Sequence, residues 1–487
     1  MKIYNSMTGK KEEFKPIDGN NVKMYACGVT VYDLSHIGHA RQAIVYAMIA
    51  DYLRYRGYNV KYVRNYTDVD DKIIKRANEQ GKDALEFSRE QIAETEKDMS
   101  ALHITDADEK TKASEYINQI IEFVQGLIDK GYAYKAENGD VYYRVRKFNE
   151  YGKLSHRNVD DMLNGVRIDL EEGKEDPIDF ALWKSAKPGE IYWESPWGQG
   201  RPGWHIECSV MALNTLGETI DIHGGGRDLV FPHHENEIAQ SEALTGKPFA
   251  KCWSHCGLIK INGEKMSKSL GNSLTIRDAL KMYNYEVIKY VMLSKHYGSD
   301  VDILDEDYTL AEKHLYYFYN TISKMNEFIS QYEGNPEGEK VQDDISNTIK
   351  EKFIEVMDDD FNTTAALANL HGIFKYVNNL MKTANKGNRT QVANTLAKVL
   401  EEVKEAYGVL GLFEQNPEEF ANILKEKYLK KINLDTEYIE SEIAKRAEAK
   451  KQKDFETADG IRAKLDEQEI ILNDTINGTT WDIKVLY

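Results

Sequence analysis

A strand, a helix and a second strand follow one another near the N-terminus, and this order restricts the possible folds. Residues 22–26 predict a short strand, and apolar residues then recur at helical spacing from Ile37 to Leu53. Gly57 is placed to end that helix, and residues 58–63 alternate like a second strand. Because strands joined through a helix usually run parallel, the unit predicts an α/β domain built on a parallel sheet.

Changes of pattern along the chain predict several domains. A chain of 487 residues is too long for one hydrophobic core. A helical pattern at 113–131 and a turn at Asn138 and Gly139 interrupt the sheet domain, and long helical patterns dominate beyond it. We therefore expect an α/β domain at 1–307 with an insertion at about 85–200, a helical bundle at 308–411 and a small α+β domain at 412–487.

The composition restricts the compartment. Four cysteines are too few for a disulfide scaffold, so reduced thiols or metal ligands are expected. No stretch reaches the roughly eighteen apolar residues of a membrane helix, and the N-terminus lacks the apolar core of a signal peptide. These features favour a cytoplasmic protein that does not enter a membrane.

The net charge of −18 argues against a chain coated with nucleic acid, because phosphate contacts need lysine and arginine. A local basic run lies near the C-terminus, at Lys445, Arg446, Lys450, Lys451 and Lys453. Such a run is either a solvated helix face or an RNA contact, and the sequence leaves both interpretations open.

Two histidines lie where the first predicted strand turns into the first helix. His36 and His39 are three residues apart, so both face one side of the first helical turn. A helix N-terminus presents unpaired N–H groups, and Gly38 lets a ligand approach the backbone closely. The motif fits a phosphate site, although a histidine-rich helix cap would have the same spacing.

A lysine-rich motif, Lys265 to Ser269, lies in a loop ahead of a helix that Thr275 can cap. Lys265 and Lys268 could fold over a triphosphate and stabilise the departing pyrophosphate. A solvated turn is the alternative for such a loop by itself. The occurrence of both motifs in this order favours a nucleotide site, and we place the lysine-loop region at about 260–307.

The two motifs resemble the HIGH and KMSKS motifs of class I aminoacyl-tRNA synthetases, whose catalytic domain is Rossmann-like. Further segments look like those that mark the cysteinyl-tRNA synthetases: Met24–Asp33, Pro202–Cys208, Asp221–Gly226 and Phe231–Glu237. The resemblance extends to the C-terminus, and it departs from the family at Val29, where proline is often expected. It implies a cysteine–tRNA ligase with a Rossmann-like catalytic domain.

His233 and Glu237 lie four residues apart, a usual way for one helix to supply two zinc ligands. Sequence spacing alone cannot show which other donors converge on them. The resemblance implies the family's single zinc site, formed by Cys27, Cys208, His233 and Glu237.

A rival ligand set lies in Cys252, His255 and Cys256. On a strand, both of its sulfurs would share one face. No second ligand pair follows at zinc-finger spacing, which favours structural or incidental cysteines.

The resemblance also implies the reaction and the roles of individual residues. L-cysteine attacks the α-phosphate of ATP, which binds with Mg²⁺, and the cysteinyl adenylate then reacts with the terminal ribose of cysteine tRNA. The phosphates are assigned to His36, His39, Lys265 and Lys268, the adenosine to Gly224, Gly225 and Gly226, and the cysteine pocket to Thr67 and Trp204. Among these, Lys268 is the expected direct ATP contact, whereas Thr67 could also be strand surface and Trp204 a core aromatic.

Two alternatives remain for the whole chain. A cysteine ligase acting on a small amino sugar would resemble the catalytic half and end sooner, and a non-catalytic paralogue would bind tRNA only. The bundle and the C-terminal domain favour tRNA binding and anticodon recognition, with Trp481 either stacking on a base or closing a small core. The family is usually monomeric, so we expect a monomer.

Overall fold

The computed structural model describes residues 1–487 apart from 160–172, 262–263, 266–272, 476–477 and 487. The chain forms two compact units. The first unit comprises Met1–Tyr285, Met292–Ile303 and Val356–Thr364, and the second comprises Glu286–Val291, Leu304–Glu355 and Ala365–Tyr487.

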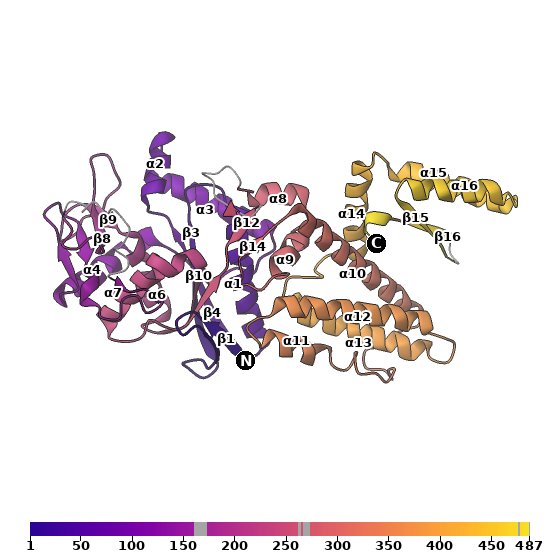
Figure 1. Ribbon diagram of the computed structural model, residues 1–487, viewed down its shortest axis with the longest axis horizontal. Coiled ribbons are helices and arrows are strands. Elements are labelled where there is room, and N and C mark those ends of the chain that lie inside the picture. Colours follow the sequence, from indigo (N-terminus) through magenta and orange to yellow (C-terminus); the bar gives the residue numbers. More distant parts are fainter. Residues whose placement is uncertain (160–172, 262–263, 266–272, 476–477, 487) are drawn as a thin grey trace. The chain divides into compact units, whose positions relative to one another are not determined.

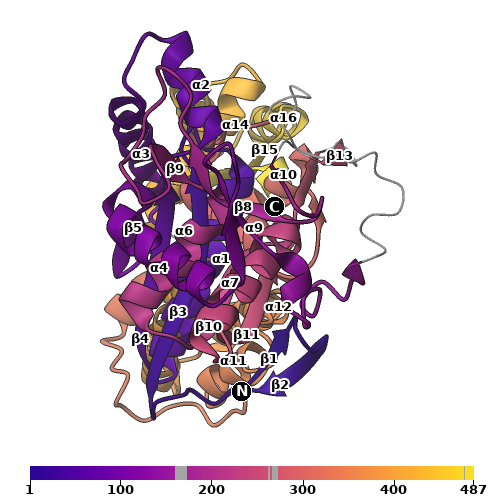
Figure 2. The same cartoon turned by 90° about the vertical axis from the view of Figure 1, so that its left-hand side faces the viewer.

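A five-stranded parallel sheet forms the centre of the first unit. Its strands lie in the order β11 (Ala250–Cys256), β10 (Ile220–Gly226), β3 (Asn21–Thr30), β4 (Asn59–Thr67) and β5 (Glu109–Lys112). Helices α1 (Ile37–Tyr55) and α6 (Trp204–Leu216) pack on opposite faces of the sheet (Figures 1 and 2). The predicted α/β fold with a parallel sheet is confirmed.

Helix α1 lies in the interior, which explains why apolar residues occupy so much of its surface. All side chains from Ala40 to Ala50 are buried, as expected for a helix that is apolar on every side. Its buried cation, Arg41, donates to the carbonyl oxygens of Leu258 at 3.4 Å and Ser299 at 2.7 Å. These bonds tie the backbone at Leu258 and Ser299 to the first turns of α1.

An antiparallel sheet is inserted in the chain between β5 and β10. It consists of β6 (Ala133–Lys135), β7 (Val141–Tyr143), β8 (Phe180–Ser185) and β9 (Gly200–Pro202), and α4 (Ile117–Asp129) packs beside it. The insertion begins later than the predicted residue 85, because α3 (Ala84–Ala101) leads into β5 of the parallel sheet. Strand β5 reads Glu-Lys-Thr-Lys, so it lacks the apolar alternation that marks a strand.

Shorter elements complete the first unit. They are the hairpin β1 (Lys2–Asn5) and β2 (Lys10–Glu13), helix α2 (Asp71–Glu79), the short turns Ala113–Glu115, Val145–Lys147, Arg227–Leu229 and Val230–His234, helices α7 (Glu235–Thr245), α8 (Ile276–Met282) and α9 (Tyr285–Leu293), and strands β12 (Ile259–Ile261), β13 (Glu264–Lys265) and β14 (Val301–Asp302). Strand β12 pairs with both β13 and β14. The last residues of α9 belong to the first unit and its middle belongs to the second.

Helices dominate the second unit, as the sequence predicts. They are α10 (Asp305–Gln331), α11 (Ile349–Met357), α12 (Thr363–Thr383), α13 (Arg389–Gly408), α14 (Pro417–Lys431), α15 (Thr436–Lys451) and α16 (Phe455–Glu467), followed by the hairpin β15 (Ile470–Thr475) and β16 (Gly478–Ile483) and the turn Lys484–Leu486. In the part of the chain that the structure describes, none of the helices has the length and apolar character needed to cross a bilayer.

The predicted boundary at residue 411 has no counterpart in the packing. Helix α14 lies against α10, where the rings of Phe420 and Tyr319 stack 4.2 Å apart. Lys427 and Tyr428 of α14 both bind the carboxylate of Glu312, which is almost completely buried. Residues 412–431 therefore belong with the bundle. The sequence could not show this, because α14 is amphipathic in the same way as a helix of a separate domain would be.

Candidate active site and metal centre

The four predicted metal ligands meet in the first unit. Cys27 lies in β3, Cys208 in α6, His233 just before α7, and Glu237 in α7. The sulfur of Cys27 is 3.7 Å from the sulfur of Cys208, 3.7 Å from Nε2 of His233 and 3.5 Å from Oε1 of Glu237. All four side chains are buried. The fold thus brings together residues that lie about two hundred positions apart, while their binding of zinc stays a prediction.

The spacing of these donors fits tetrahedral zinc. Zinc binds thiolate sulfur at about 2.3 Å and imidazole nitrogen at about 2.0 Å, so neighbouring donors lie roughly 3.3–3.8 Å apart. The three separations from Cys27 fall in this range, and the His233–Glu237 pair is closer, at 2.9 Å, because its atoms interact directly. Two sulfurs, an imidazole and a carboxylate also suit the chemistry of zinc.

Cys27 and Glu237 belong to a second possible group, with His223 and His234. In that group, Nε2 of His223 lies 2.8 Å from Oε2 of Glu237, and Nδ1 of His234 lies 2.8 Å from Nε2 of His255. Each imidazole thus already has a side-chain partner, and the group offers only one sulfur. The set with two sulfurs is the better zinc site, and His223 orients Glu237 from behind.

Mutual contact prepares the ligand set for a cation. The hydrogen bond to Cys27 lowers the pKa of Cys208 to about 6, against the effect of burial. Burial opposes the charged form of His233, but Glu237 and Cys208 raise the pKa of its imidazole to about 10. Burial also opposes the Glu237 carboxylate, whose pKa His223 and His233 nevertheless hold well below its usual range. Without a metal, the site therefore holds a thiolate and a carboxylate around a protonated imidazole, and a bound zinc ion would take the place of that proton.

One of the predicted cysteine-pocket residues, Trp204, contacts this cluster, and the other, Thr67, lies at the end of the neighbouring strand β4. Trp204 is 37% exposed, and its indole stacks on the ring of His233 with centroids 4.3 Å apart. Thr67 is buried at the end of β4 and pairs across the sheet with Thr30, beyond Cys27 in β3. Because its indole is half-open, Trp204 is not a fully buried core aromatic, and its contact with a substrate stays a prediction.

His36 and His39 form the start of helix α1. Nδ1 of His36 accepts a hydrogen bond from the backbone N–H of Gly38 at 3.2 Å, and Nδ1 of His39 accepts one from the N–H of His36 at 3.3 Å. Their rings stack 3.7 Å apart. The histidines therefore cap the helix, which was the alternative interpretation, and they also present two imidazoles at a helix N-terminus, where an anion is favoured.

The lysine motif begins and ends next to known elements. The backbone of Lys265 lies in β13, whereas Lys268 is outside the described residues. Downstream of the motif, the N–H of Ile37 donates to the carbonyl of Leu274 at 3.0 Å, and the N–H of Ile276 donates to the carbonyl of Ser35 at 3.0 Å. The described residues that follow the lysine motif are thus hydrogen-bonded on both sides of His36, whereas the approach of Lys268 to the histidines stays a prediction.

Gly224, Gly225 and Gly226 end strand β10, at the sheet edge where parallel sheets bind ligands. A Cβ atom would meet the ring of Tyr46 at Gly224 and the ring of His234 at Gly225. Protein packing therefore already requires two of these glycines, and their assignment to the adenosine stays a prediction.

The rival cysteines do not form a metal cluster among the described residues. Cys252 and Cys256 are both buried in β11, and burial raises the pKa of each thiol, that of Cys256 to about 11. The imidazole of His255 lies against Ser6 and His234. The structure thus favours the interpretation as structural cysteines.

Comparisons with known proteins agree with this geometry. Residues 13–313 match the family described as tRNA synthetases class I (C) catalytic domain, and residues 352–414 match the DALR domain. The cysteine–tRNA ligase of Thermodesulfovibrio yellowstonii is 49% identical over 100% of both chains. The chain belongs to the cysteine–tRNA ligase family. The ligase of Chromohalobacter salexigens is 48% identical over 99% of this chain and 100% of that protein.

Solved structures share the fold of this family member at low sequence identity. A methionyl-tRNA synthetase from Mycobacterium tuberculosis, in complex with methionyl-adenylate, superposes with a TM-score of 0.62 at 15% identity, covering 83% of this chain and 94% of that one. A putative arginyl-tRNA synthetase from Campylobacter jejuni gives a TM-score of 0.55 at 13% identity, covering 81% and 94%. These similarities confirm the class I synthetase fold.

The structure places further residues at the candidate site that the sequence analysis did not identify. Nδ1 of His205 lies 3.0 Å from Nδ1 of His233, which leaves Nε2 of His233 facing the cluster. Glu207 is completely buried next to Cys208, and burial raises the pKa of its carboxyl well above the usual range. Both lie in the family-like segment at 202–208, but only the fold shows which way they face.

Gly28 is required by the close approach of two strands beside Cys27 of the candidate metal site. The register of β3 and β4 shifts between Ala26 and Val29, and a Cβ atom on Gly28 would collide with the backbone carbonyl of Asn65. A Gly28→Ala substitution should therefore destabilise the first unit by about 3 kcal/mol.

Urea denaturation followed by tryptophan fluorescence tests this, because all tryptophans except Trp481 lie in the first unit. Gly126→Ala is the control, since its new methyl would meet only the end of the Leu244 side chain. Equal stability of the two variants would contradict the packing argument.

Proposed function

We propose that the protein activates L-cysteine with ATP and transfers it to the 3′-terminal adenosine of cysteine tRNA, and that a zinc ion held by Cys27, Cys208, His233 and Glu237 selects cysteine. The observation that carries this proposal is the cluster of donors with tetrahedral spacing in the unit that also holds both nucleotide motifs. The full-length similarity to cysteine–tRNA ligases supports it.

A metal explains how serine would be rejected. Serine differs from cysteine only in its oxygen, and an apolar pocket discriminates near-isosteres by about a hundredfold or less. Bound zinc would supply a bond to the soft thiolate that a serine hydroxyl makes poorly. The protein residues then hold the rest of the amino acid, with the indole of Trp204 above His233 and Thr67 at the end of β4.

The nucleotide is assigned to the start of α1 and the lysine loop. His36 and His39 lie at the helix N-terminus, and the loop that carries Lys268 is anchored beside them. The reaction needs no covalent enzyme nucleophile, so positioning and neutralisation of phosphate charge account for catalysis. ATP binds as its Mg²⁺ complex, and Gly224–Gly226 are assigned to the adenosine.

The helical unit is assigned to tRNA. Its match to the DALR domain and the relatives' full-length similarity support a role beyond cysteine activation. We assign the bundle to tRNA binding and the C-terminal helices and hairpin to anticodon recognition, in a monomer that works in the cytoplasm.

Two assays test the function. ATP–pyrophosphate exchange should depend on cysteine when each amino acid is supplied in turn, and total tRNA should be charged with cysteine only. Exchange without tRNA charging would favour the amino-sugar ligase, and tRNA binding without exchange would favour a non-catalytic paralogue.

A further inference from the structure

A cavity of about 700 Å³ lies between α10 and α12 in the helical unit. Lys313 and Lys324 line it from α10, and Lys375 and Lys382 line it from α12. At a rise of 1.5 Å per residue, these pairs are spaced by roughly 16 Å along α10 and roughly 10 Å along α12. Each pair lies at a multiple of the helical period, so each rim of the cavity carries a row of ammonium groups.

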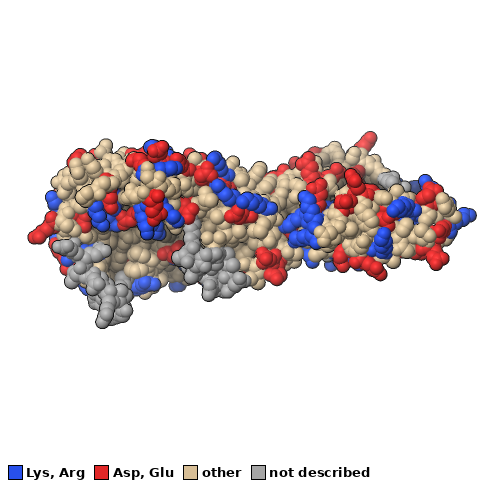
Figure 3. Space-filling model, turned by 90° about the horizontal axis from the view of Figure 1, so that it is seen from above, with Lys and Arg blue, Asp and Glu red and all other residues tan. Residues whose placement is uncertain are grey.

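The positive charge of this cavity is not neutralised by the protein. No aspartate or glutamate lines it, and none of its four lysines forms an ion pair or a hydrogen bond with another described residue. The whole chain has a net charge of −18, and cationic and anionic side chains are interspersed on the face in Figure 3. The four lysines therefore form a local positive region on a protein of negative net charge, and such a region favours an anionic ligand.

The basic run near the C-terminus contrasts with this cavity. Arg446 is buried and binds Asp474 through both terminal nitrogens, at 2.7 and 3.0 Å. Lys450 also binds Asp474, and Lys445 binds Glu442 at 2.6 Å. These cations thus have carboxylate partners within the domain, with Asp474 shared by Arg446, Lys450 and Arg462. Trp481 is likewise buried and donates to Glu440 at 2.7 Å, so it closes a small core, which was the alternative to stacking on a base.

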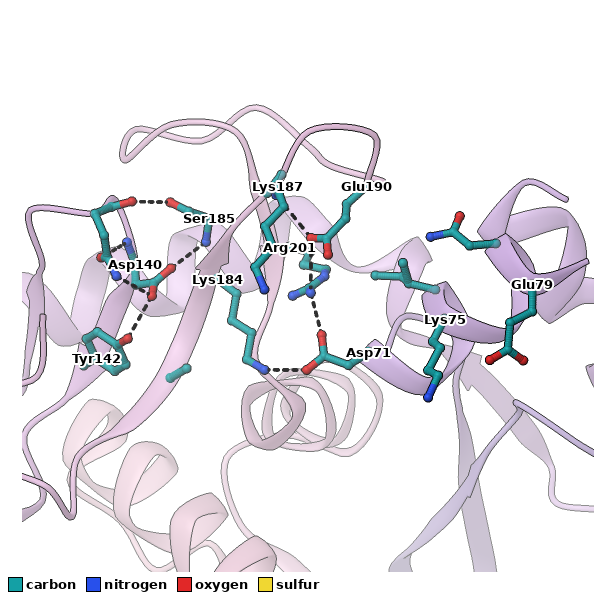
Figure 4. A pocket seen from close by; sticks show the side chains of 15 residues that line it. Asp71, Lys75, Glu79, Asp140, Tyr142, Lys184, Ser185, Lys187, Glu190 and Arg201 are labelled. Atoms are coloured by element: carbon teal, nitrogen blue, oxygen red, sulfur yellow. Dashed lines mark hydrogen bonds and ion pairs between the residues drawn. The ribbon is translucent and has the colours of Figure 1, made fainter. Parts of the chain in front are cut away.

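A second cavity, beside α2, is larger than the α10–α12 cavity but does not offer unpaired cations to a phosphate. The cavity of about 1000 Å³ beside α2 also contains lysines, but Lys184 and Arg201 both point to Asp71 (Figure 4), at 2.8 and 2.5 Å. Arg201 is also 3.4 Å from Glu190. In the cavity beside α2, Lys184 and Arg201 are therefore already paired with carboxylates of the protein.

The floor of the α10–α12 cavity offers aromatic and hydrogen-bonding groups. The ring of Tyr317 is 37% exposed, and Asn320, Asn379 and His371 line the cavity without a side-chain hydrogen bond to another described residue. Burial lowers the pKa of His371. The pKa of His314 is lowered to about 4 by burial and by the nearby His371 and Lys313. Both imidazoles are therefore neutral near pH 7, so each can donate and accept hydrogen bonds.

We infer that the α10–α12 cavity binds one unpaired nucleotide of the tRNA, with its base against Tyr317 and its flanking phosphates on the lysines of the two rims. This inference rests on the proposed function, because it takes tRNA as the partner. The size of the cavity suits a single base and its sugar, and aromatic stacking with amide groups is how unpaired RNA bases are bound. A duplex would reach the rims but leave the floor empty.

The phosphate contacts are tested by charge removal. Lys324, Lys375 and Lys382 are all exposed, so changing all three to glutamine should not affect folding. Equilibrium binding of cysteine tRNA by the full chain should weaken at least tenfold, and the slope of log K against log salt should fall by about 2, since each phosphate contact contributes about 0.7–0.9. The matched control changes Lys10, Lys11 and Lys15 to glutamine, since these lysines are exposed at the β1–β2 hairpin of the first unit and have no proposed role. Equal salt slopes in the cavity variant and the unmodified protein would overturn the inference. A larger loss of tRNA affinity in the control variant than in the cavity variant would also overturn it.

The base contact is tested separately. Tyr317→Ala should weaken tRNA binding by about fivefold or more without changing the salt slope, and Tyr317→Phe should retain binding, because stacking depends on the ring. Saturable binding of free CMP or AMP that Tyr317→Ala abolishes, with tRNA affinity unchanged, would overturn the inference in favour of a free nucleotide. The unmodified protein must first charge tRNA with cysteine. Failure there contradicts the proposed function, whereas unaltered tRNA binding by the variants of a charging enzyme contradicts the cavity alone.

Discussion

A Cys208→Ser variant is expected to lose its bound zinc and to activate cysteine at least about a hundredfold more slowly than the unmodified chain. Substitutions behind a metal ligand already cost roughly 10–100-fold, and Cys208 is a proposed ligand itself. Serine is nearly the same size as cysteine, so the buried position in α6 stays filled. What changes is the donor, because a hydroxyl remains protonated and binds zinc poorly.

Metal analysis of the purified chains provides the measurement. The unmodified protein should contain about one zinc per chain, and cysteine-dependent pyrophosphate exchange should fall in parallel with zinc content. Cys252→Ser is a close control, because Cys252 is also a buried free cysteine in the first unit, and its thiol donates to the backbone carbonyl of Tyr4 at 3.9 Å. Full zinc content in the Cys208 variant, or zinc lost on changing Cys252, would show that the metal is held elsewhere.

Much of the parallel sheet was predictable because its signals are local. The strand before His36, the helix after it and the strand ending at Thr67 each carry their own periodicity. Strand β5 was missed, since four polar residues form it and only pairing with β4 makes it a strand. The packing of α14 on the bundle, across the predicted boundary at residue 411, was not predictable for a related reason: the contact between Phe420 and Tyr319 joins residues a hundred positions apart.

The metal site shows where sequence reasoning depended on resemblance. The spacing of His233 and Glu237 identifies one ligand pair, but nothing local indicates that Cys27 and Cys208 join it. The imidazoles behind the ligands, His205 and His223, depend on rotamers that only packing decides. Whether a charged side chain is paired also depends on the fold. The run at 445–453 looked basic in sequence, and only the fold revealed Asp474 beside it.

A Lys268→Ala variant is expected to form cysteinyl adenylate on the order of a hundredfold more slowly, with little change in the affinity for cysteine. Removing one preorganised contact to charge that develops in the transition state commonly costs this much. Lys268 itself lies outside the described residues, but the ends of its loop do not. Strand β13 leads into it, and Leu274 and Ile276 are hydrogen-bonded to Ile37 and Ser35 on either side of His36.

This anchoring gives the prediction its direction and its control. The chain after the loop is held beside the N-terminus of α1, so we expect Lys268 to act on phosphates bound there and not on the cluster around Cys27, and cysteine binding should be retained. Lys260→Ala is the matched control, because Lys260 lies in β12 and pairs with Asp300 at 3.7 Å. Rapid-quench measurement of a single round of adenylate formation separates the rate from the affinity. A normal rate in the Lys268 variant would remove this lysine from the reaction, and an equal loss in both variants would mean that the substitutions act on the fold of the β12–β13 hairpin instead.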